Sequence, residues 1–154
     1  MTSPDMLDDV TQTGIDAGTV TVTAANGMIT TATQGPDPRF GMQSPLTTAL
    51  SVATPGGGPS LSMTKTRSAV LGTPGDPFSV QTLTDTTTIA GRTTTSVFDA
   101  ATMTTQTTSP AGRIANMTVD TRGRPVLRQM GGLNALNIGY DARGRIATLT
   151  QGAG

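Results

Sequence analysis

The 154-residue chain is about one domain long, and its composition excludes several classes of protein. It contains no histidine and no cysteine, so it lacks the usual general bases, thiol nucleophiles and zinc ligands of enzymes. A formal net charge of +0, with 13% charged residues, is unlike that of nucleic-acid binders or of highly charged disordered chains.

The apolar content predicts an all-β protein with a thin core. Only 34% of the residues are hydrophobic and 3% are aromatic, so small and β-branched side chains must provide the packing. Threonine is the most frequent residue and suits a pleated, half-buried surface, whereas 19 glycines, 10 prolines and the absence of glutamate disfavour helices. We therefore expect an antiparallel meander of short hairpins.

The first residues, 1–14, form an acidic segment that is expected to be a loose tail. It contains Asp5, Asp8 and Asp9, and it lacks the basic stretch and apolar run of a signal peptide. No apolar run in the chain has the length of a membrane span. Because Gly154 directly follows a repeat and no closing segment is seen, the chain is expected to be a piece of a longer polypeptide.

Residues 15–77 predict irregular β repeats joined by Pro/Gly-rich connections. The expected strands alternate apolar and polar side chains, and they are 20–23, 28–33, 46–53 and 61–66. The expected turns and connections are rich in Gly, Pro, Asn and Asp, and they are 15–19, 24–28, 34–41, 54–59 and 72–77. Residues 78–154 continue the same sheet with regular hairpins, so no strong domain boundary is expected between the two parts.

The most complete hairpin of the regular part lies at residues 137–151. Its turn, residues 141–144, begins with Asp and ends with Gly, the residues that a type I turn closing into a glycine bulge prefers. This geometry would place Tyr140 opposite Arg145, with the guanidinium on the ring or reaching back to Asp141. Valine at Gly144 is expected to strain the turn, whereas valine at Gly57 is expected to cost little.

Partial copies of this turn precede it at intervals of about ten or about twenty residues, a spacing typical of short successive strands. The copies share a Gly-Arg ending or the Asp that opens such a turn: Gly91 and Arg92, Phe98 and Asp99, Gly112 and Arg113, and Asp120, Gly123 and Arg124.

Residues 140–146, with Phe98, Asp99 and the repeated Gly-Arg turns, resemble the YD repeat of the Rhs proteins, the insecticidal toxin-complex shell subunits and the teneurins. The resemblance covers about residues 82–152. It departs from the repeat where Thr102 stands in place of Gly, where Asp99 follows Phe98 and where Asp120 follows Val119. Looser turns are expected at those copies.

The resemblance implies a structural role and no catalysis. It implies an open segment of an antiparallel sheet that spirals into a hollow shell around a toxin polypeptide. The partners would be the remainder of a longer Rhs-type polypeptide and the enclosed toxin, and the location would be outside the cell or on its surface. The alternative is an extracellular carbohydrate-binding β-repeat adhesin, with glycans as partners.

The arginines of the last third allow two readings. They form either a basic strip for anionic glycans or nucleic acid, or a set of turn residues that contact rings and backbone carbonyls. The second reading is preferred and nucleic acid is not expected as a partner, because interleaved aromatic residues and a high pI are missing.

Several motifs resemble catalytic or binding sites but are interpreted as turns. Residues 37–41 resemble the Asp-Pro-x-Gly signature of the self-cleaving core in the same family, but they have one residue too many before Gly41. The glycines at 56–58 lack the Lys-Ser or Lys-Thr of a phosphate loop. Aspartate pairs of the glycosidase kind remain the enzymatic alternative. We expect no catalytic residue, no cofactor and no metal.

Overall fold

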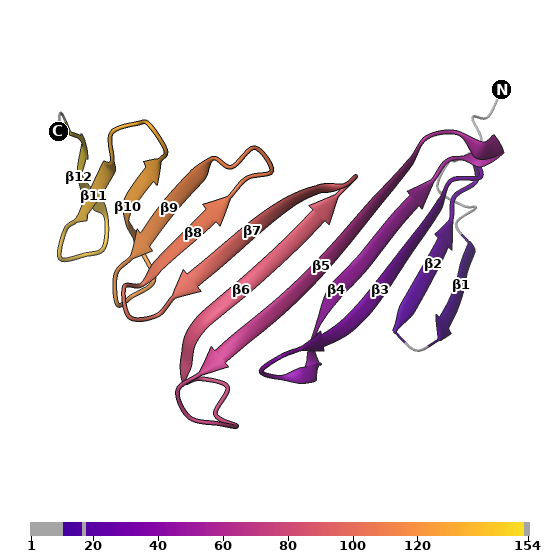
Figure 1. Cartoon of the computed structure of the whole chain (residues 1–154), viewed down its shortest axis with the longest axis horizontal. Helices are drawn as coiled ribbons and strands as arrows, with labels where there is room; N and C mark the ends of the chain where they lie inside the picture. Colours follow the sequence, from indigo (N-terminus) through magenta and orange to yellow (C-terminus); the bar gives the residue numbers. More distant parts are fainter. Residues whose placement is uncertain (1–10, 17, 153–154) are drawn as a thin grey trace. The chain divides into compact units, whose positions relative to one another are not determined.

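The computed structural model describes residues 11–16 and 18–152, which form an all-β structure of twelve strands and one short 3-10 helix. Neighbouring strands pair antiparallel in one open sheet whose order follows the chain from β1 to β12 (Figure 1), so the expected meander is confirmed. The elements are β1 Thr11–Asp16, β2 Thr19–Thr23, β3 Ile29–Asp37, β4 Gly41–Ala53, η1 Pro55–Gly57, β5 Ser60–Leu71, β6 Val80–Ile89, β7 Arg92–Asp99, β8 Thr104–Thr108, β9 Ile114–Val119, β10 Pro125–Met130, β11 Leu136–Tyr140 and β12 Ile146–Gln151.

The chain divides into two compact units. One contains the described residues up to Thr66 together with Thr87–Arg92, and the other contains Arg67–Thr86 together with the described residues from Thr93 onward. The division therefore passes through β5, β6 and β7, and it does not coincide with the Pro/Gly-rich connection that ends near residue 77.

The first unit begins earlier than the sequence predicts. β1 starts at Thr11, so residues 11–14 belong to a strand and not to a loose tail, because they find β2 as a partner. The other residues of the expected tail, 1–10, lie outside the described residues. Hydroxyl pairs face each other across β2 and β3, such as Thr21 and Thr31 at 3.4 Å. Such cross-strand pairs explain why threonine suits this sheet.

The expected connection at residues 34–41 is wrong for its first half. β3 continues through Gln34 and Gly35, which pair with Thr47 and Leu46 of β4. Pro36 lies at a register shift in this ladder, where a missing N–H is tolerated. The connection is therefore reduced to residues 38–40.

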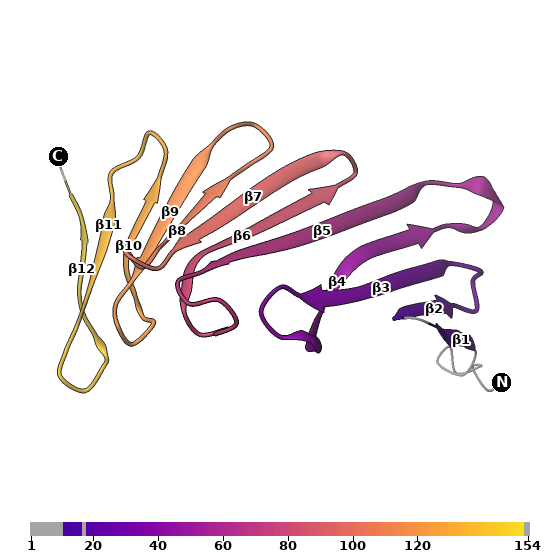
Figure 2. The same cartoon turned by 60° about the horizontal axis from the view of Figure 1, so that its bottom comes forward.

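The hairpin formed by β4, η1 and β5 is longer than the sequence predicts (Figure 2). Residues 54–59, expected as a break, contain η1, and the hydroxyl of Thr54 donates to the carbonyl oxygen of Pro59 at 2.8 Å. Exposed and half-buried side chains alternate from Met63 to Leu71, the period of a strand with two distinct faces.

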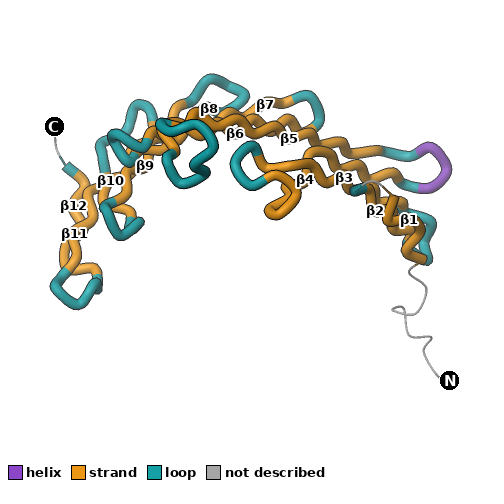
Figure 3. Tube along the Cα trace, turned by 90° about the horizontal axis from the view of Figure 1, so that it is seen from below, coloured by secondary structure: helices purple, strands orange, loops and turns teal. Residues whose placement is uncertain are grey.

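Neither unit has a conventional core. Among residues 18–152, no apolar side chain is buried, and Asp37 is the one buried polar residue, at 3% exposure. β7 to β12 of the second unit form a single layer in Figure 3, which is viewed along the sheet. Backbone ladders and cross-strand contacts must therefore provide most of the stability.

We expect the whole chain, as a dilute monomer, to unfold below about 60 °C, because residues 18–152 bury no apolar side chain and no other described strand pairs with the outer edge of β1 or of β12. Circular dichroism melting at several protein concentrations measures this. A cooperative transition well above that temperature, independent of concentration, would contradict the expectation.

Candidate functional site

The turn between β9 and β10 is organised by the carboxylate of Asp120. One of its oxygens accepts hydrogen bonds from the backbone N–H groups of Arg122 and Arg124, both at 2.9 Å, and the other accepts from Nε of Arg124 at 2.8 Å. Gly123 has a φ of 76° and donates its N–H to the carbonyl oxygen of Asp120 at 2.8 Å. In this turn Asp120 accepts the hydrogen bonds, Gly123 adopts the positive φ and Arg124 forms the ion pair.

The turn between β11 and β12 repeats this geometry. Asp141 accepts from the backbone N–H groups of Arg143 and Arg145 at 2.9 Å and from Nε of Arg145 at 2.8 Å. Of the two expected positions of the Arg145 guanidinium, the structure has the one that reaches back to Asp141. The expected position of Tyr140 opposite Arg145 is wrong, because Tyr140 lies opposite Ile146, the next residue along the chain.

A third turn uses serine in place of aspartate. Oγ of Ser109 accepts from the backbone N–H of Arg113 at 3.0 Å, and Gly112 has a φ of 73°. A hydroxyl can satisfy this N–H but cannot form an ion pair with the arginine, so the Ser109 turn lacks the charge-assisted bond of the other two.

The two remaining copies have different turns. In the loop after Phe98, the carboxylate of Asp99 accepts from the N–H of Ala101 at 2.8 Å, but the residue with positive φ is Met103, at 53°. Thr102 therefore does not take the place of a glycine with positive φ, because in this loop the next residue, Met103, has the positive φ.

Between β6 and β7 both turn residues have positive φ, Ala90 at 48° and Gly91 at 76°, as in a two-residue hairpin turn that ends at Arg92.

Tyr140 ties the β9–β10 hairpin to β11. The guanidinium carbon of Arg124 lies 4.3 Å from the centre of the Tyr140 ring, within cation–π range. The Tyr140 hydroxyl donates to the carbonyl oxygen of Pro125 at 2.8 Å, and Arg124 also contacts the Asp120 carboxylate at 2.7 Å. Carboxylate, guanidinium and ring therefore form one continuous contact from a turn to the next strand.

These turns depend on ionised aspartates. The side-chain and backbone hydrogen bonds from Arg124 lower the pKa of Asp120, and the backbone and side-chain hydrogen bonds from Arg145 lower the pKa of Asp141. A carboxyl group with a lowered pKa in the folded state stabilises the fold above its unfolded pKa, and this contribution is lost as the pH falls through the folded pKa.

We expect the urea midpoint of unfolding to fall as the pH decreases below about 4, the ordinary aspartate range. The double variant Asp120→Asn, Asp141→Asn should start from a lower midpoint at neutral pH and lose less of it in acid. An equal acid-induced loss in both proteins would show that other carboxylates control the response.

Gly144→Val is expected to lower the free energy of unfolding by about 1–2 kcal/mol, because a β-branched residue is strained at a φ of 81°. Gly57 is not the neutral control that the sequence predicts, since its φ is 75°. Gly152 is the better control, because a Cβ added there meets open space and its φ lies outside the left-handed region. Urea unfolding of both variants measures the difference, and equal losses would exclude the turn strain.

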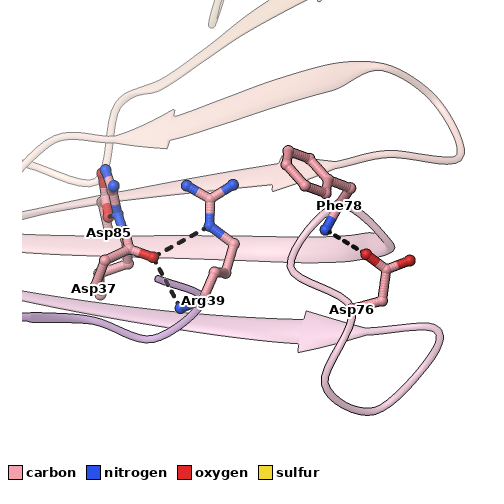
Figure 4. A network of polar contacts seen from close by, with 6 residues as sticks. Asp37, Arg39, Asp76, Phe78 and Asp85 are labelled. Atoms are coloured by element: carbon pink, nitrogen blue, oxygen red, sulfur yellow. Dashed lines mark hydrogen bonds and ion pairs between the residues drawn. The ribbon is translucent and has the colours of Figure 1, made fainter. Parts of the chain in front are cut away.

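The Asp37 turn between β3 and β4 is a compact polar cluster (Figure 4). The buried carboxylate accepts from the backbone N–H of Arg39 at 2.8 Å and from its Nε at 3.3 Å. The guanidinium carbon of Arg39 lies 4.9 Å from the centre of the Phe40 ring. This arrangement agrees with the interpretation of residues 37–41 as a turn. The figure also shows Asp76 accepting from the N–H of Phe78.

The register of the second unit separates two kinds of surface, which the sequence alone does not predict. Residues that face each other across an antiparallel pair share one face of the sheet. One face presents Gln106, Asn116 and Gln129 in a row across β8, β9 and β10. On the opposite face, Met117 lies between Thr105 and Arg128. In the sequence, the alternation of Ala115 and Met117 with Asn116 indicates that β9 has an apolar and a polar face. The rows across three strands depend on how β9 pairs with β8 and β10.

Each face carries a hollow. The polar hollow, of about 520 Å³, is formed by Asp99, Thr102, Thr104, Gln106, Asn116, Thr118 and Gln129 with Val97 and Leu127. Oδ1 of Asn116 is buried and has no hydrogen-bond partner among the described residues. The apolar hollow, of about 460 Å³, has Met117, Arg128 and Met130 in its lining.

The described residues contain no group of three or more acidic side chains positioned to hold a metal ion. In the same part of the chain, no helix has the length and apolarity needed to cross a membrane. The sequence matches no family model and no curated protein.

Proposed function

We propose that the chain is a non-catalytic wall segment of a YD-repeat shell that encloses a toxin polypeptide and protects it. The observation that carries this proposal is the tie between successive repeats, in which Arg124 of one turn contacts the ring of Tyr140 on the next hairpin. A wall made of repeats needs such contacts, because each hairpin gains its stability from its neighbours.

The architecture supports the same role. An open antiparallel sheet whose order follows the chain is extended by each added hairpin, and a single layer exposes both faces. The mechanism is sequestration: a closed wall of this kind separates its contents from solvent and proteases. The carboxylates of Asp120 and Asp141 are engaged in ion pairs within their turns, which supports a non-catalytic role.

Protease protection of the complete natural polypeptide tests the shell. A segment of it that is cut when expressed alone should resist a broad-specificity protease when it is joined to the repeats. Tyr140→Ala should reduce this protection, whereas Arg143→Ala, at an exposed turn position, should preserve it. Equal digestion with and without the repeats would overturn the shell proposal.

The non-catalytic part of the proposal has its own test. The purified chain should keep its intact mass over days at neutral and mildly acidic pH, because the Asp37 carboxylate is engaged by Arg39. A discrete cut that Asp37→Ala abolishes would instead assign self-cleavage to this turn.

Carbohydrate binding is the second candidate, and the polar hollow favours it. Hydroxyl, amide and carboxylate groups from β7 to β10 converge there, and the buried Oδ1 of Asn116 lacks a partner. It ranks second because the hollow has no aromatic ring on which a sugar could stack. A glycan array with the wild-type chain and with Asn116→Ala and Gln106→Ala distinguishes the two functions: specific binding lost in both variants would favour the adhesin.

A further inference from the structure

The apolar hollow lies where β9, β10 and the β10–β11 loop meet on one face of the second unit. We call it the apolar groove, and its main residues are Ala115, Met117, Arg128, Met130, Leu133 and Leu136. Met130 is 62% exposed and Leu133 is 59% exposed. Side chains of this size, gathered around a hollow of about 460 Å³, form a surface of the size and apolarity of ligand sites.

The chemistry of the groove is set by one charge. Arg128 is the one charged residue of its lining, and it lies between Met117 and Leu136 in a row across three strands. Arg128 is exposed and forms no ion pair with any described residue. An occupant that covers this row must therefore supply an anion, since a buried guanidinium without one is costly.

This charge argues against a second copy of the chain as the occupant. Two apolar grooves facing each other around a twofold axis would bring two Arg128 guanidiniums together, and no aspartate lines the groove to neutralise them. Like charges brought together in an apolar interface oppose association.

We propose that the apolar groove binds a polypeptide segment in which an acidic side chain is flanked by apolar ones. The carboxylate would pair with Arg128, and the apolar side chains would cover Met117, Met130 and Leu136. That the partner is a polypeptide rests on the proposed function, in which the repeats face an enclosed chain. The binding surface itself rests on the groove geometry and charge.

Fluorescence anisotropy of the full chain tests this proposal. The probes are a fluorescein-labelled peptide of alternating Leu, Gly and Asp residues and its counterpart with Lys in place of Asp. The acidic peptide should bind at least about tenfold more tightly than the basic one, and added salt should reduce this preference.

The variants identify the site. Arg128→Glu should reverse the preference, Arg128→Lys should keep it, and Met130→Ser should weaken acidic-peptide binding about tenfold. Arg143→Glu makes the same charge change at an exposed turn position outside the groove and should have little effect. Circular dichroism spectra establish that each variant is folded.

Four results would overturn the proposal. They are no binding of either peptide, equal binding of both, equal losses in Arg128→Glu and Arg143→Glu, and tighter binding of laurate than of any peptide. Concentration-dependent dimerisation abolished by Met130→Ser would assign the groove to a second copy instead. The peptide-binding assay does not depend on the shell. If the repeats fail to protect a segment from protease but the acidic peptide still binds, the enclosed chain is rejected as the partner. The groove then remains a peptide-binding site.

Discussion

Tyr140→Ala is expected to lower the free energy of unfolding by about 2–3 kcal/mol. The change removes the ring that covers the Arg124 guanidinium at 4.3 Å and the hydroxyl that donates to Pro125 at 2.8 Å. Because folded proteins are only marginally stable, a loss of this size is a large fraction of the total free energy of unfolding. Urea unfolding followed by circular dichroism measures it.

Two further variants separate the parts of this contact. Tyr140→Phe keeps the ring and loses only the hydroxyl, so it should cost about 1 kcal/mol. Phe78→Ala also removes an aromatic ring, one that is 84% exposed, so it should cost clearly less than Tyr140→Ala. If Tyr140→Ala costs no more than Phe78→Ala, the tie between successive hairpins does not stabilise the sheet.

Asp37→Ala is expected to destabilise the first unit by roughly 2–4 kcal/mol. The variant leaves the Arg39 N–H without its acceptor at 2.8 Å and leaves the Arg39 guanidinium, whose side chain is 22% exposed, without this carboxylate. Hydrogen exchange of the β3–β4 backbone, together with urea unfolding of the whole chain, reports the loss.

Asp37→Asn is the matched comparison, because its amide oxygen can still accept the Arg39 N–H while the charge is removed. The loss of stability in Asp37→Asn should be clearly smaller than in the alanine variant, but above zero. Identical exchange rates in wild type and Asp37→Ala would mean that the buried carboxylate contributes no stability to the turn.

Local turn chemistry was readable in the residues themselves. Asp120 and Gly123, and likewise Asp141 and Gly144, lie within a few positions of their hydrogen-bond partners, so their turns depend on short-range geometry that residue type controls. The period-two alternation of apolar and polar residues, with abundant threonine, was likewise sufficient for the all-β class. Neither signal extends beyond a pair of neighbouring strands.

Contacts between strands were decided only by the tertiary structure. Gln34 and Gly35 are strand residues because Thr47 and Leu46 lie opposite them, although a connection suited their sequence equally well. Arg124, and not Arg145, meets the Tyr140 ring, and the residue opposite the tyrosine is Ile146. The groove around Arg128 likewise exists only once three strands are paired. Residue patterns specify which positions share a strand face, but register specifies which side chains of different strands meet, and it is set by the whole ladder of pairings.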